Sequence, residues 1–479
     1  MKFSRRQFLS AAAGAAAAPL AAQRRPPNVV LILIDDYGWT DTGYNGSKFY
    51  ETPNIDRLAR GGMIFTDGYS ASPVCSPTRA AIMTGKYPAR LHLTAHLQGA
   101  SNRFHHTKVI QPNTRLELPL GEVTIAELLR KQGYRSACIG KWHLGKTGFL
   151  PSDQGFDVSL AGDEAGSTNN FFYPEWKKKI PLDGKDGDYL TDRLTGLAVD
   201  FIRENKDRPF FLYLPHFAVH TPIQGKPEKV RKYDAKSRPD NPQNYGEYGA
   251  MVESTDESVG RVMQALRDQG IEDSTLVIFS ADNGGVTSLE WKDRPITSNL
   301  PLRVGKGHLY EGGIRVPTIV RLPGVTKAGS TCREPIVSYD YAPTIAQLAG
   351  VPAGETKQMD GQSFLPLLQG KQTMGRAENF WHYPHYSPQR GRPSAAIRRG
   401  NDKLILFFED NRVELYNLKD DIGENKDLAA SQPAKAAELR GRLEAWLRET
   451  DAQIPKPNPN YNQAREREAG QPSGPVTAK

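Results

Sequence analysis

The chain has 479 residues, a formal net charge of +8, 44 glycines and 35 prolines. Because this length exceeds that of one compact domain, we expect two domains with many turns and long loops. Three cysteines exclude a scaffold built on disulfides, and sequence spacing does not decide whether Cys138 and Cys332 pair. The basic charge suits a polyanionic substrate, although an ordinary exported protein can carry it equally well. We expect no nucleic-acid partner.

The N-terminal segment predicts export. Residues 4–9 (SRRQFL) followed by an apolar run over residues 11–22 are typical of a twin-arginine signal, and a disordered basic tail would not account for this order. The run is too short and too weakly hydrophobic to span a bilayer. We therefore expect residues 1–22 to be a signal peptide read by the twin-arginine export machinery. The mature form would be periplasmic or extracellular and would not span a membrane.

The first expected strand leads directly into two carboxylates. Residues 28–34 (NVVLILI) form a continuous β-branched and aliphatic run, as a central strand buried on both faces requires. Asp35 and Asp36 follow at its carboxyl end, where ligands bind in open α/β sheets. Either aspartate alone could belong to an ordinary turn.

Residues 75–79 (CSPTR) are the most informative short motif. They follow a small, turn-rich approach and open a helical pattern, with Pro77 in its first turn. Cys75 would then lie at or just before a helix N-terminus, where the dipole and Arg79 favour a negative charge. A small buried thiol and the nucleophile of a cysteine–histidine hydrolase are the alternatives.

The chain continues as alternating helices and strands up to about residue 372. We expect helices over residues 123–132 and 246–269, and strands over residues 134–139, 209–214 and 275–280. Polar residues follow these strands, which predicts one active edge of a single α/β sheet. They are Lys141, His143, His216, His220, Asp282 and Asn283.

The character of the sequence changes between residues 370 and 378. Short expected strands over residues 395–399, 403–409 and 413–416 precede an expected helix over residues 433–448. We therefore divide the chain into a catalytic domain over residues 28–372 and a smaller α+β domain over residues 378–450. Residues 451–479 are rich in Pro, Asn, Gln and Glu and are expected to form a flexible tail.

Five separated segments together resemble the formylglycine-dependent sulfatases of the alkaline-phosphatase superfamily, over residues 28 to about 450. The resemblance implies an α/β fold in which helices flank a large mixed sheet, with a smaller C-terminal domain of antiparallel sheet plus helix. The segments are Asp35-Asp36, residues 75–79, residues 140–145 (GKWHLG), residues 282–285 (DNGG) and residues 305–307 (GKG).

The resemblance also implies a nucleophile and a metal site. In this family a maturation enzyme oxidises the motif cysteine, here Cys75, to formylglycine. One hydroxyl of the hydrated aldehyde attacks sulfur, and the other later expels sulfate. One divalent cation would be Ca²⁺, with Mg²⁺ as the alternative, because the available ligands are hard oxygens. Besides the modified Cys75, its ligands would be Asp35, Asp36, Asp282 and Asn283.

The remaining roles follow from the same resemblance and from the negative charge of a sulfate ester. His220 is assigned as the general acid, while His216 lies nearer the strand end and competes for that role. Lys141 and His143 lie two residues apart on a segment expected to be extended, so their side chains would face the same way. Arg79 would support the metal site, Lys141 and Lys306 would contact sulfate, and His143 would contact the diol.

The sequence therefore predicts an exported sulfatase acting on a sulfated carbohydrate. A phosphonate monoester or phosphodiester hydrolase with the same nucleophile, and a sulfated-glycan-binding protein without catalysis, remain as alternatives. Two loops could read the sugar, although ordinary crossover loops fit them equally well. They are residues 91–107, with His92, His96, His105 and His106, and residues 162–176, with Asn169 and Asn170.

Overall fold

A large mixed sheet forms the centre of the molecule. The computed structural model describes residues 25–97, 106–287 and 295–463. Within these ranges the sheet has eight strands, parallel except where β9 pairs with its two neighbours. In spatial order they are β10 (Ser330–Cys332), β2 (Met63–Phe65), β9 (Thr318–Arg321), β8 (Thr275–Ala281), β1 (Asn28–Ile34), β7 (Phe210–Pro215), β5 (Arg135–Ile139) and β6 (Val158–Leu160).

Strand β1 separates two apolar cores. Every residue of β1 is buried. Val30, Ile32 and Ile34 belong to one core, whereas the alternate residues of the strand belong to the other. Because successive side chains of a strand point to opposite faces, a continuous apolar run is what a strand covered on both faces requires.

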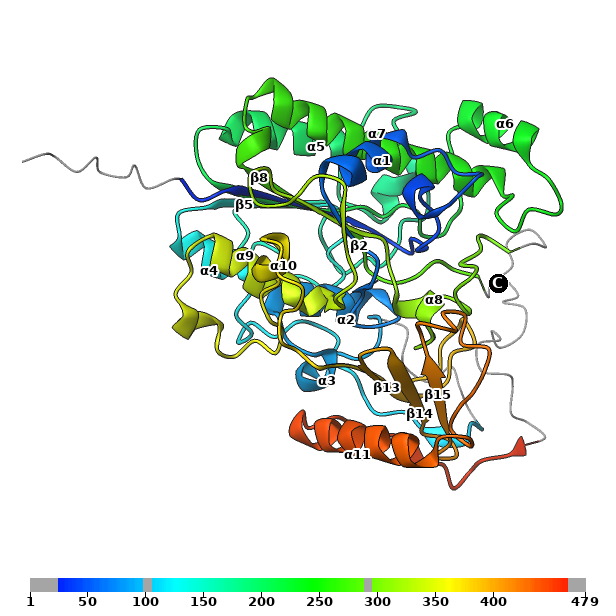
Figure 1. Cartoon of the computed structure of the whole chain (residues 1–479). Helices are drawn as coiled ribbons and strands as arrows, with labels where there is room; N and C mark the ends of the chain where they lie inside the picture. Colours follow the sequence, from blue (N-terminus) through cyan, green and yellow to red (C-terminus); the bar gives the residue numbers. More distant parts are fainter. Residues whose placement is uncertain (1–24, 98–105, 288–294, 464–479) are drawn as a thin grey trace, which may run out of the picture.

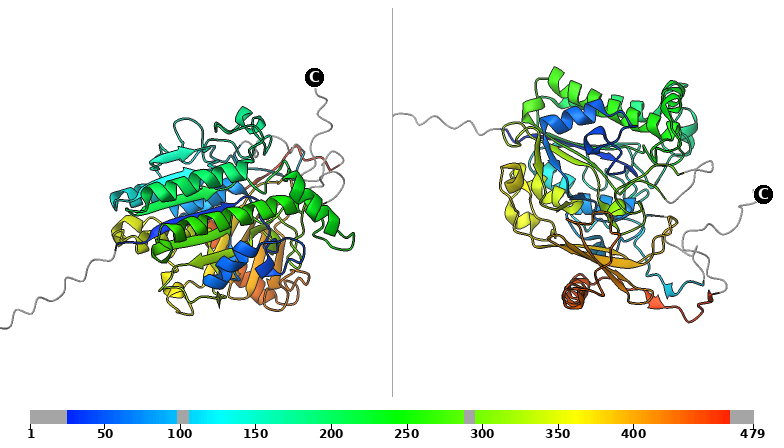
Figure 2. Two further views of the ribbon diagram at one scale, coloured as in Figure 1. Left: turned by 90° about the horizontal axis from the view of Figure 1, so that it is seen from above. Right: turned by 45° about the vertical axis from the view of Figure 1, so that its right-hand side comes forward.

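Helices cover both faces of the sheet (Figures 1 and 2). One face carries α1 (Pro53–Gly61), α5 (Leu190–Asn205), α6 (Pro227–Lys236) and α7 (Gly246–Asp268). The other carries α2 (Cys75–Thr84), α3 (Pro88–Leu91), α4 (Ile125–Lys131), α9 (Tyr341–Leu348) and α10 (Leu365–Leu368). The four-residue helix α8 (Glu311–Ile314) lies between the large sheet and the smaller domain.

The smaller C-terminal domain is an antiparallel sheet backed by one helix. Its strands, in order, are β12 (Glu378–Tyr383), β13 (Ser394–Arg399), β14 (Asp402–Phe407) and β15 (Val413–Asn417). Helix α11 (Pro433–Glu449) packs on the outer face, where Leu404 and Leu406 point. The inner face, with Ile405 and Phe407, packs on the segment that leads into Cys75. Strand β12 was not anticipated from the sequence.

Part of the expected flexible tail is paired with the body of the protein. Strand β16 (Lys456–Pro457) pairs antiparallel with β4 (Val109–Ile110), and Asn458 donates to the carbonyl of Thr107 at 2.7 Å. The prediction of a flexible tail was therefore wrong for residues 451–463, because backbone pairing is not visible in their polar composition. Residues 464–479 lie outside the described residues. Strand β3 (Gly68–Tyr69) pairs with β11 (Ile336–Val337) near the seam between the domains.

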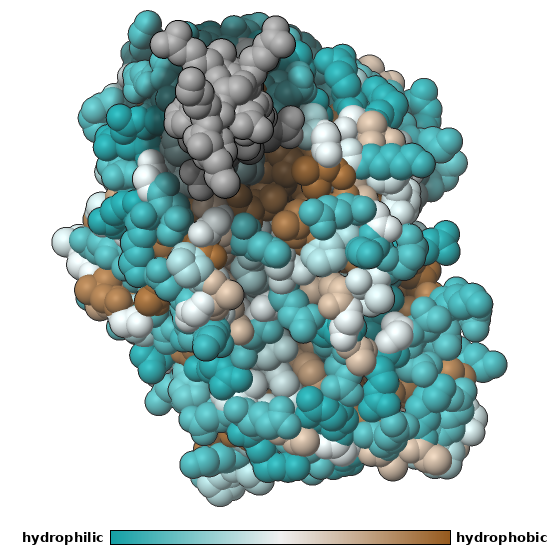
Figure 3. Space-filling model, turned by 60° about the vertical axis from the view of Figure 1, so that its left-hand side comes forward, coloured by the Kyte–Doolittle hydropathy of each residue, from teal (hydrophilic) through white to brown (hydrophobic). Residues whose placement is uncertain are grey.

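The expected signal peptide also lies outside the described residues. Among the residues that are described, no helix is both long and apolar enough to cross a membrane. The face shown in Figure 3 is mostly hydrophilic, with apolar residues scattered over it and gathered in one area beside the residues drawn in grey.

Candidate functional site

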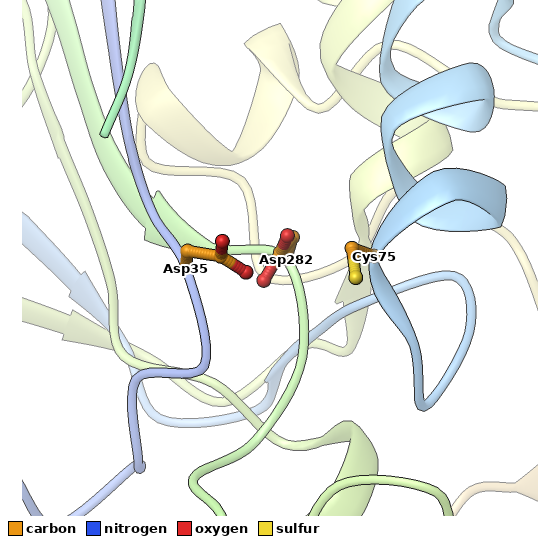
Figure 4. A group of neighbouring side chains, drawn as sticks. All are labelled: Asp35, Cys75 and Asp282. Carbon is orange, nitrogen blue, oxygen red and sulfur yellow. The ribbon is translucent and has the colours of Figure 1, made fainter. Parts of the chain in front are cut away.

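Two strand ends and one helix start meet at the carboxyl edge of the large sheet. Ile34 and Ala281 are partners in the parallel register of β1 and β8, so Asp35 and Asp282 leave the sheet side by side. Cys75 is the first residue of α2 and faces them from the other side (Figure 4). Ligand atoms of Asp35, Cys75 and Asp282 all lie within 4.8 Å of one another.

Arg79 joins these elements from the second turn of α2. Its Nε and Nη2 donate to Oδ2 of Asp282 at 2.9 and 2.7 Å, and its Nη1 donates to the carbonyl of Lys141 at 2.7 Å. The side chain is fully buried. Charge-assisted bonds from a planar guanidinium are directional, so Arg79 fixes the orientation of Asp282.

Two buried lysines neutralise the aspartates that follow β1. Lys141 Nζ lies 2.6 Å from Asp35 Oδ2, and Lys306 Nζ lies 2.6 Å from Asp36 Oδ1. Burial and the nearby charge of Asp282 raise the pKa of Asp35 well above its usual value. Burial also acts to raise the pKa of Asp36, but Lys306 and His220 outweigh it and lower that pKa.

The oxygens at this edge fit a hard divalent cation. Asp35 Oδ1 and Asn283 Oδ1 are buried and accept no hydrogen bond from the residues that the structure describes. Asn283 Nδ2 donates to Asp36 Oδ1 at 2.8 Å, so the amide oxygen of Asn283 points away from Asp36. Carboxylate and amide oxygens are the ligands that Ca²⁺ and Mg²⁺ take.

The charges of the site suit an anionic substrate once a cation is bound. Three carboxylates face three fixed cations, so their formal charges cancel. Bound M²⁺ would leave an excess of two positive charges, which would attract an anionic ester. The cations are Arg79, Lys141 and Lys306, and the carboxylates are Asp35, Asp36 and Asp282.

The setting of Cys75 differs from the prediction that its surroundings favour a negative charge. Cys75 does begin α2, with Val74 as the N-cap. However, burial raises the pKa of its thiol, and Asp35 and Asp282 raise it further against the opposing effect of Lys141 and Lys306. A neutral buried thiol is a poor nucleophile, so this environment disfavours direct thiol catalysis.

The prediction of an extended segment from Lys141 to His143 was wrong. His143 has a φ of +57°, in the left-handed region, and its backbone N–H donates to the carbonyl of Asp163 at 3.0 Å. A Cβ on Gly166 would lie 2.5 Å from the His143 ring, so this glycine permits a close approach. Burial, together with Lys141, lowers the pKa of His143 well below its usual value.

The two competing histidines have different neighbours. His220 Nε2 lies 3.5 Å from Asp36 Oδ2, and burial lowers the pKa of His220 to about 3. His216 Nε2 lies 2.9 Å from the hydroxyl of Ser258 on α7. Within the described part of the chain, His220 therefore contacts a carboxylate of the site, whereas His216 contacts a serine hydroxyl.

The Lys306 loop is held between both domains. A Cβ on Gly305 would lie 2.1 Å from the carbonyl oxygen of Gly285, and one on Gly307 would lie 2.1 Å from Ser387 Oγ, so glycine is required on both sides of Lys306. The Gly307 N–H also donates to the carbonyl of Pro73 at 2.8 Å. The smaller domain therefore supports the site directly.

Sequence reasoning missed the residues that the smaller domain contributes. Burial raises the pKa of Tyr383, and the charges of Lys306 and Cys75 act on it as well. His385 Nε2 lies 2.8 Å from Thr94 Oγ1, which belongs to the expected sugar-recognition loop over residues 91–107. No local pattern marked either residue; only an aromatic- and histidine-rich stretch (residues 380–386) could have drawn attention to them.

The two expected reader loops are only partly near the site. His96 lies close enough to lower the pKa of both His143 and His385. His92 instead contacts the carbonyl of Asp451 at 2.8 Å. His105 lies outside the described residues. Asn170 accepts the N–H of Phe172 within its own turn, while Asn169 is exposed.

Known proteins are similar to this chain along nearly its whole length. The family model described as Sulfatase matches residues 27–351, and the model for the C-terminal part of N-sulphoglucosamine sulphohydrolase matches residues 304–453. A protein named sulfatase from Formosa agariphila is 34% identical over 88% of this chain and 89% of its own length. Human arylsulfatase A is 34% identical over 83% of this chain and 82% of its own length.

A solved structure confirms the expected fold. Ps i-CgsB in complex with k-i-k-neocarrahexaose is 30% identical, with a TM-score of 0.76 over 93% of this chain and 95% of that chain. The large mixed sheet with its flanking helices and the small antiparallel domain are thus those of the alkaline-phosphatase superfamily. The chain therefore belongs to the sulfatase family and is a sulfuric ester hydrolase.

Proposed function

We propose that this protein hydrolyses sulfate monoesters of a sulfated carbohydrate, using a formylglycine made from Cys75 and one divalent cation. The observation that carries the proposal is that the buried residues Cys75, Asp35 and Asp282 lie together, with three fixed cations around them. The carbohydrate is supported by relatives: one is named N-acetylgalactosamine-6-sulfatase, and the Ps i-CgsB structure holds a neocarrahexaose.

Asp35, Asp36, Asp282 and Asn283 would hold the cation, together with the modified Cys75. The cation would supply positive charge at the nucleophile and at the ester oxygens, with Ca²⁺ expected and Mg²⁺ as the alternative. The hydrated aldehyde of formylglycine would supply the attacking hydroxyl. Arg79 fixes Asp282 and the backbone at Lys141, so it positions two parts of the site at once.

The other side chains would act on charge and on protons. Lys141 and Lys306 are buried cations that would bind the sulfate oxygens and hold the ester in place. Burial lowers the pKa of His220 to about 3, and the negative charge of a bound sulfate ester would raise it again, so that His220 would donate a proton to the bridging oxygen as the S–O bond breaks. His143, buried and with Nδ1 unpartnered among the described residues, would bind a hydroxyl at position 75.

We further propose that the chain is exported through its twin-arginine segment, residues 1–22, to the periplasm or beyond. A formylglycine-generating enzyme is then a required partner. The proposed division is a catalytic domain over residues 28–372 and a smaller domain over residues 378–450. The inner face of the smaller sheet packs beside Cys75, which supports a role for this domain in completing the site.

Sulfate release from sulfated oligosaccharides tests the function. The protein is co-produced with a formylglycine-generating enzyme, conversion of Cys75 is verified by peptide mass spectrometry, and Cys75→Ala serves as the control. We expect release by the matured protein and none by the control. Cleavage of a phosphodiester or phosphonate monoester without sulfate release would favour the alternative hydrolase. Binding of the saccharides without any turnover by verified formylglycine protein would favour the non-catalytic alternative.

A further inference from the structure

The segment from Gly162 to Lys179 passes directly beside the site. The carbonyl of Asp163 accepts the His143 N–H at 3.0 Å, and Gly166 lies against the His143 ring. The next residue, Ser167, accepts a hydrogen bond from Lys179 Nζ at 3.0 Å. The Lys179 ammonium is therefore linked to the His143 ring through two adjacent residues.

Lys179 differs from the two lysines before it. Lys177 pairs with Asp183 and Lys178 pairs with Glu175. Among residues 25–97, 106–287 and 295–463, no carboxylate lies within 4.0 Å of Lys179 Nζ. Lys179 is exposed. Partial desolvation and the charge of Lys141 lower its pKa, while the carboxylate of Asp163 acts in the opposite direction.

The chemistry of this position suits an anion. An ammonium offers three donor hydrogens and no acceptor, and Ser167 takes only one of them. Lys141 is fully buried against Asp35, whereas Lys179 is open to solvent. Lys179 is joined through Ser167 and Gly166 to the ring of His143, so its ammonium lies close to the residues expected to surround the reacting sulfate.

We propose that Lys179 recognises a second sulfate group of the saccharide, next to the one that is hydrolysed. This inference rests on the proposed function and specifies its substrate class: multiply sulfated saccharides are preferred over those with one sulfate. Lys179 is thus a specificity-determining residue and takes no part in the chemical step. If Lys179 had only a structural role, that role would be its single hydrogen bond to Ser167.

Binding measured on the Cys75→Ala protein tests the proposal without turnover. Isothermal titration compares matched saccharide pairs that differ by one sulfate, with glucosamine 6-O-sulfate and glucosamine 2-N,6-O-disulfate as one pair and sulfated galactans as another. We expect the doubly sulfated member to bind roughly 3- to 10-fold more tightly, and this preference to shrink at high salt, as for an exposed ion pair.

Three variants separate charge from structure. Lys179→Gln keeps a donor for Ser167 but removes the charge, and it is expected to abolish the preference. Lys179→Arg keeps the charge and should retain most of the preference. Lys178→Gln, the matched control one residue away, should leave it unchanged. In the matured enzyme, kcat/KM for 4-nitrophenyl sulfate should change less than about two-fold in every variant, since that substrate has only one sulfate.

The outcomes are distinct from those that test the proposed function. Preference retained by Lys179→Gln, or absent from the Cys75→Ala protein for every pair, would overturn the role of Lys179. An equal loss of 4-nitrophenyl sulfate turnover would also overturn it, since it would place Lys179 in the support of the site itself. If no sulfate ester is turned over by matured protein, the proposed function fails, while the binding comparison still decides the preference.

Discussion

Arg79 donates two hydrogen bonds to one carboxylate oxygen of Asp282, although the two residues lie 203 positions apart in the sequence. The other carboxylate oxygen of Asp282 accepts the backbone N–H of Asp36 at 3.2 Å. Asp282 therefore ties the start of α2 to the end of β1. Because all three residues are buried, the loss of one partner leaves an uncompensated charge.

Replacement of Arg79 by lysine tests this arrangement. Lysine keeps the charge but cannot make two bonds to Asp282 and a third to Lys141, so we expect a loss of about 2 kcal/mol or more in the free energy of unfolding. Sulfate turnover should fall at least 100-fold, because Asp282 loses its orientation. Urea denaturation and sulfatase kinetics measure the two effects.

Arg90→Lys is the matched control. Arg90 also contacts an aspartate, Asp360, with two nitrogens, but its side chain is 40% exposed. Such surface pairs contribute less than about 1 kcal/mol, so this variant should be nearly as stable and as active as the wild type. Equal effects of the two substitutions would contradict the role given to Arg79.

The strand-end residues of the site could be predicted because a simple rule places them. Apolar runs predict buried strands, and parallel strands present their carboxyl ends at one edge. That rule brings Asp35 and Asp282 together, and the register of β1 with β8 confirms it. The same runs predicted β1 and β8 to within one residue of their bounds.

Other features depended on tertiary contacts that no local pattern reports. Tyr383 lies on the inner face of the small sheet, which packs on the approach to Cys75, and pairing between domains is not encoded in a short window. The left-handed conformation of His143 is held by the carbonyl of Asp163, 20 residues later in the chain. The raised pKa of Cys75 comes from burial, which outweighs the helix dipole that the motif suggested.

Removal of the metal should weaken both activity and stability. Asp35 and Asp282 are buried near each other, and the charge of Asp282 helps to raise the pKa of Asp35, which indicates repulsion that a cation would relieve. A ligand that binds only the folded state at 100 times its Kd stabilises it by about 2.7 kcal/mol. Treatment with a chelator should therefore lower the melting temperature and abolish turnover, and Ca²⁺ or Mg²⁺ should restore both.

Two substitutions locate the metal effect. Asp282→Asn should make the melting temperature respond little to chelator or added cation, because one carboxylate ligand is lost. Asp192 lies on α5 and pairs with Lys226, so Asp192→Asn removes an ion pair elsewhere in the protein. The melting temperature of this variant should respond to chelator and cation as that of the wild type does. Full activity in protein shown by elemental analysis to be metal-free would refute the metal site.

His220 and His216 can be separated by the basicity of the leaving group. If His220 is the general acid, His220→Gln should slow hydrolysis of a sugar sulfate by about 10²–10⁴-fold, because a sugar alkoxide needs a proton as it leaves. Hydrolysis of 4-nitrophenyl sulfate should fall much less, since nitrophenolate is a stable anion.

His216→Gln should not change the ratio between the two substrates. Its ring contacts Ser258, so this substitution is expected to act on stability, measured by thermal unfolding. An equal loss on both substrates in His220→Gln would reject the assignment, and a leaving-group effect in His216→Gln would transfer it to His216.

The seam between the two domains contains a buried carboxylate pair that shares one lysine. Lys403 Nζ lies 2.8 Å from Glu311 Oε1 and 2.8 Å from Glu424 Oε1, and all three side chains are fully buried. Burial and the neighbouring Glu311 raise the pKa of Glu424 to about 7, against the attraction of Lys403. In the unfolded chain this carboxyl would have its ordinary pKa of 4.5.

Glu424→Gln isolates the pH dependence of this carboxylate. Between pH 4.5 and 7 the folded state holds a proton that the unfolded state has lost, so the contribution of Glu424 is full below pH 4.5 and declines as the pH rises through 7. The glutamine that replaces it in the variant cannot titrate. The free energy of unfolding of the variant minus that of the wild type should therefore increase from pH 5 to pH 8, by about 1–3 kcal/mol.

The pH dependence contributed by the buried histidines has the opposite sign, because their pKa values are lowered. It is common to both proteins and therefore cancels in this difference. Urea denaturation at unit pH steps gives the measurement, and Glu438→Gln, at a carboxylate that is 61% exposed beside Arg399, should give a difference that does not vary with pH. A flat or falling difference for Glu424→Gln would show that Glu424 is already ionised at pH 5. Lys403 would then be paired with two fully ionised carboxylates at the seam, and Glu424 would not be protonated in the folded protein at that pH.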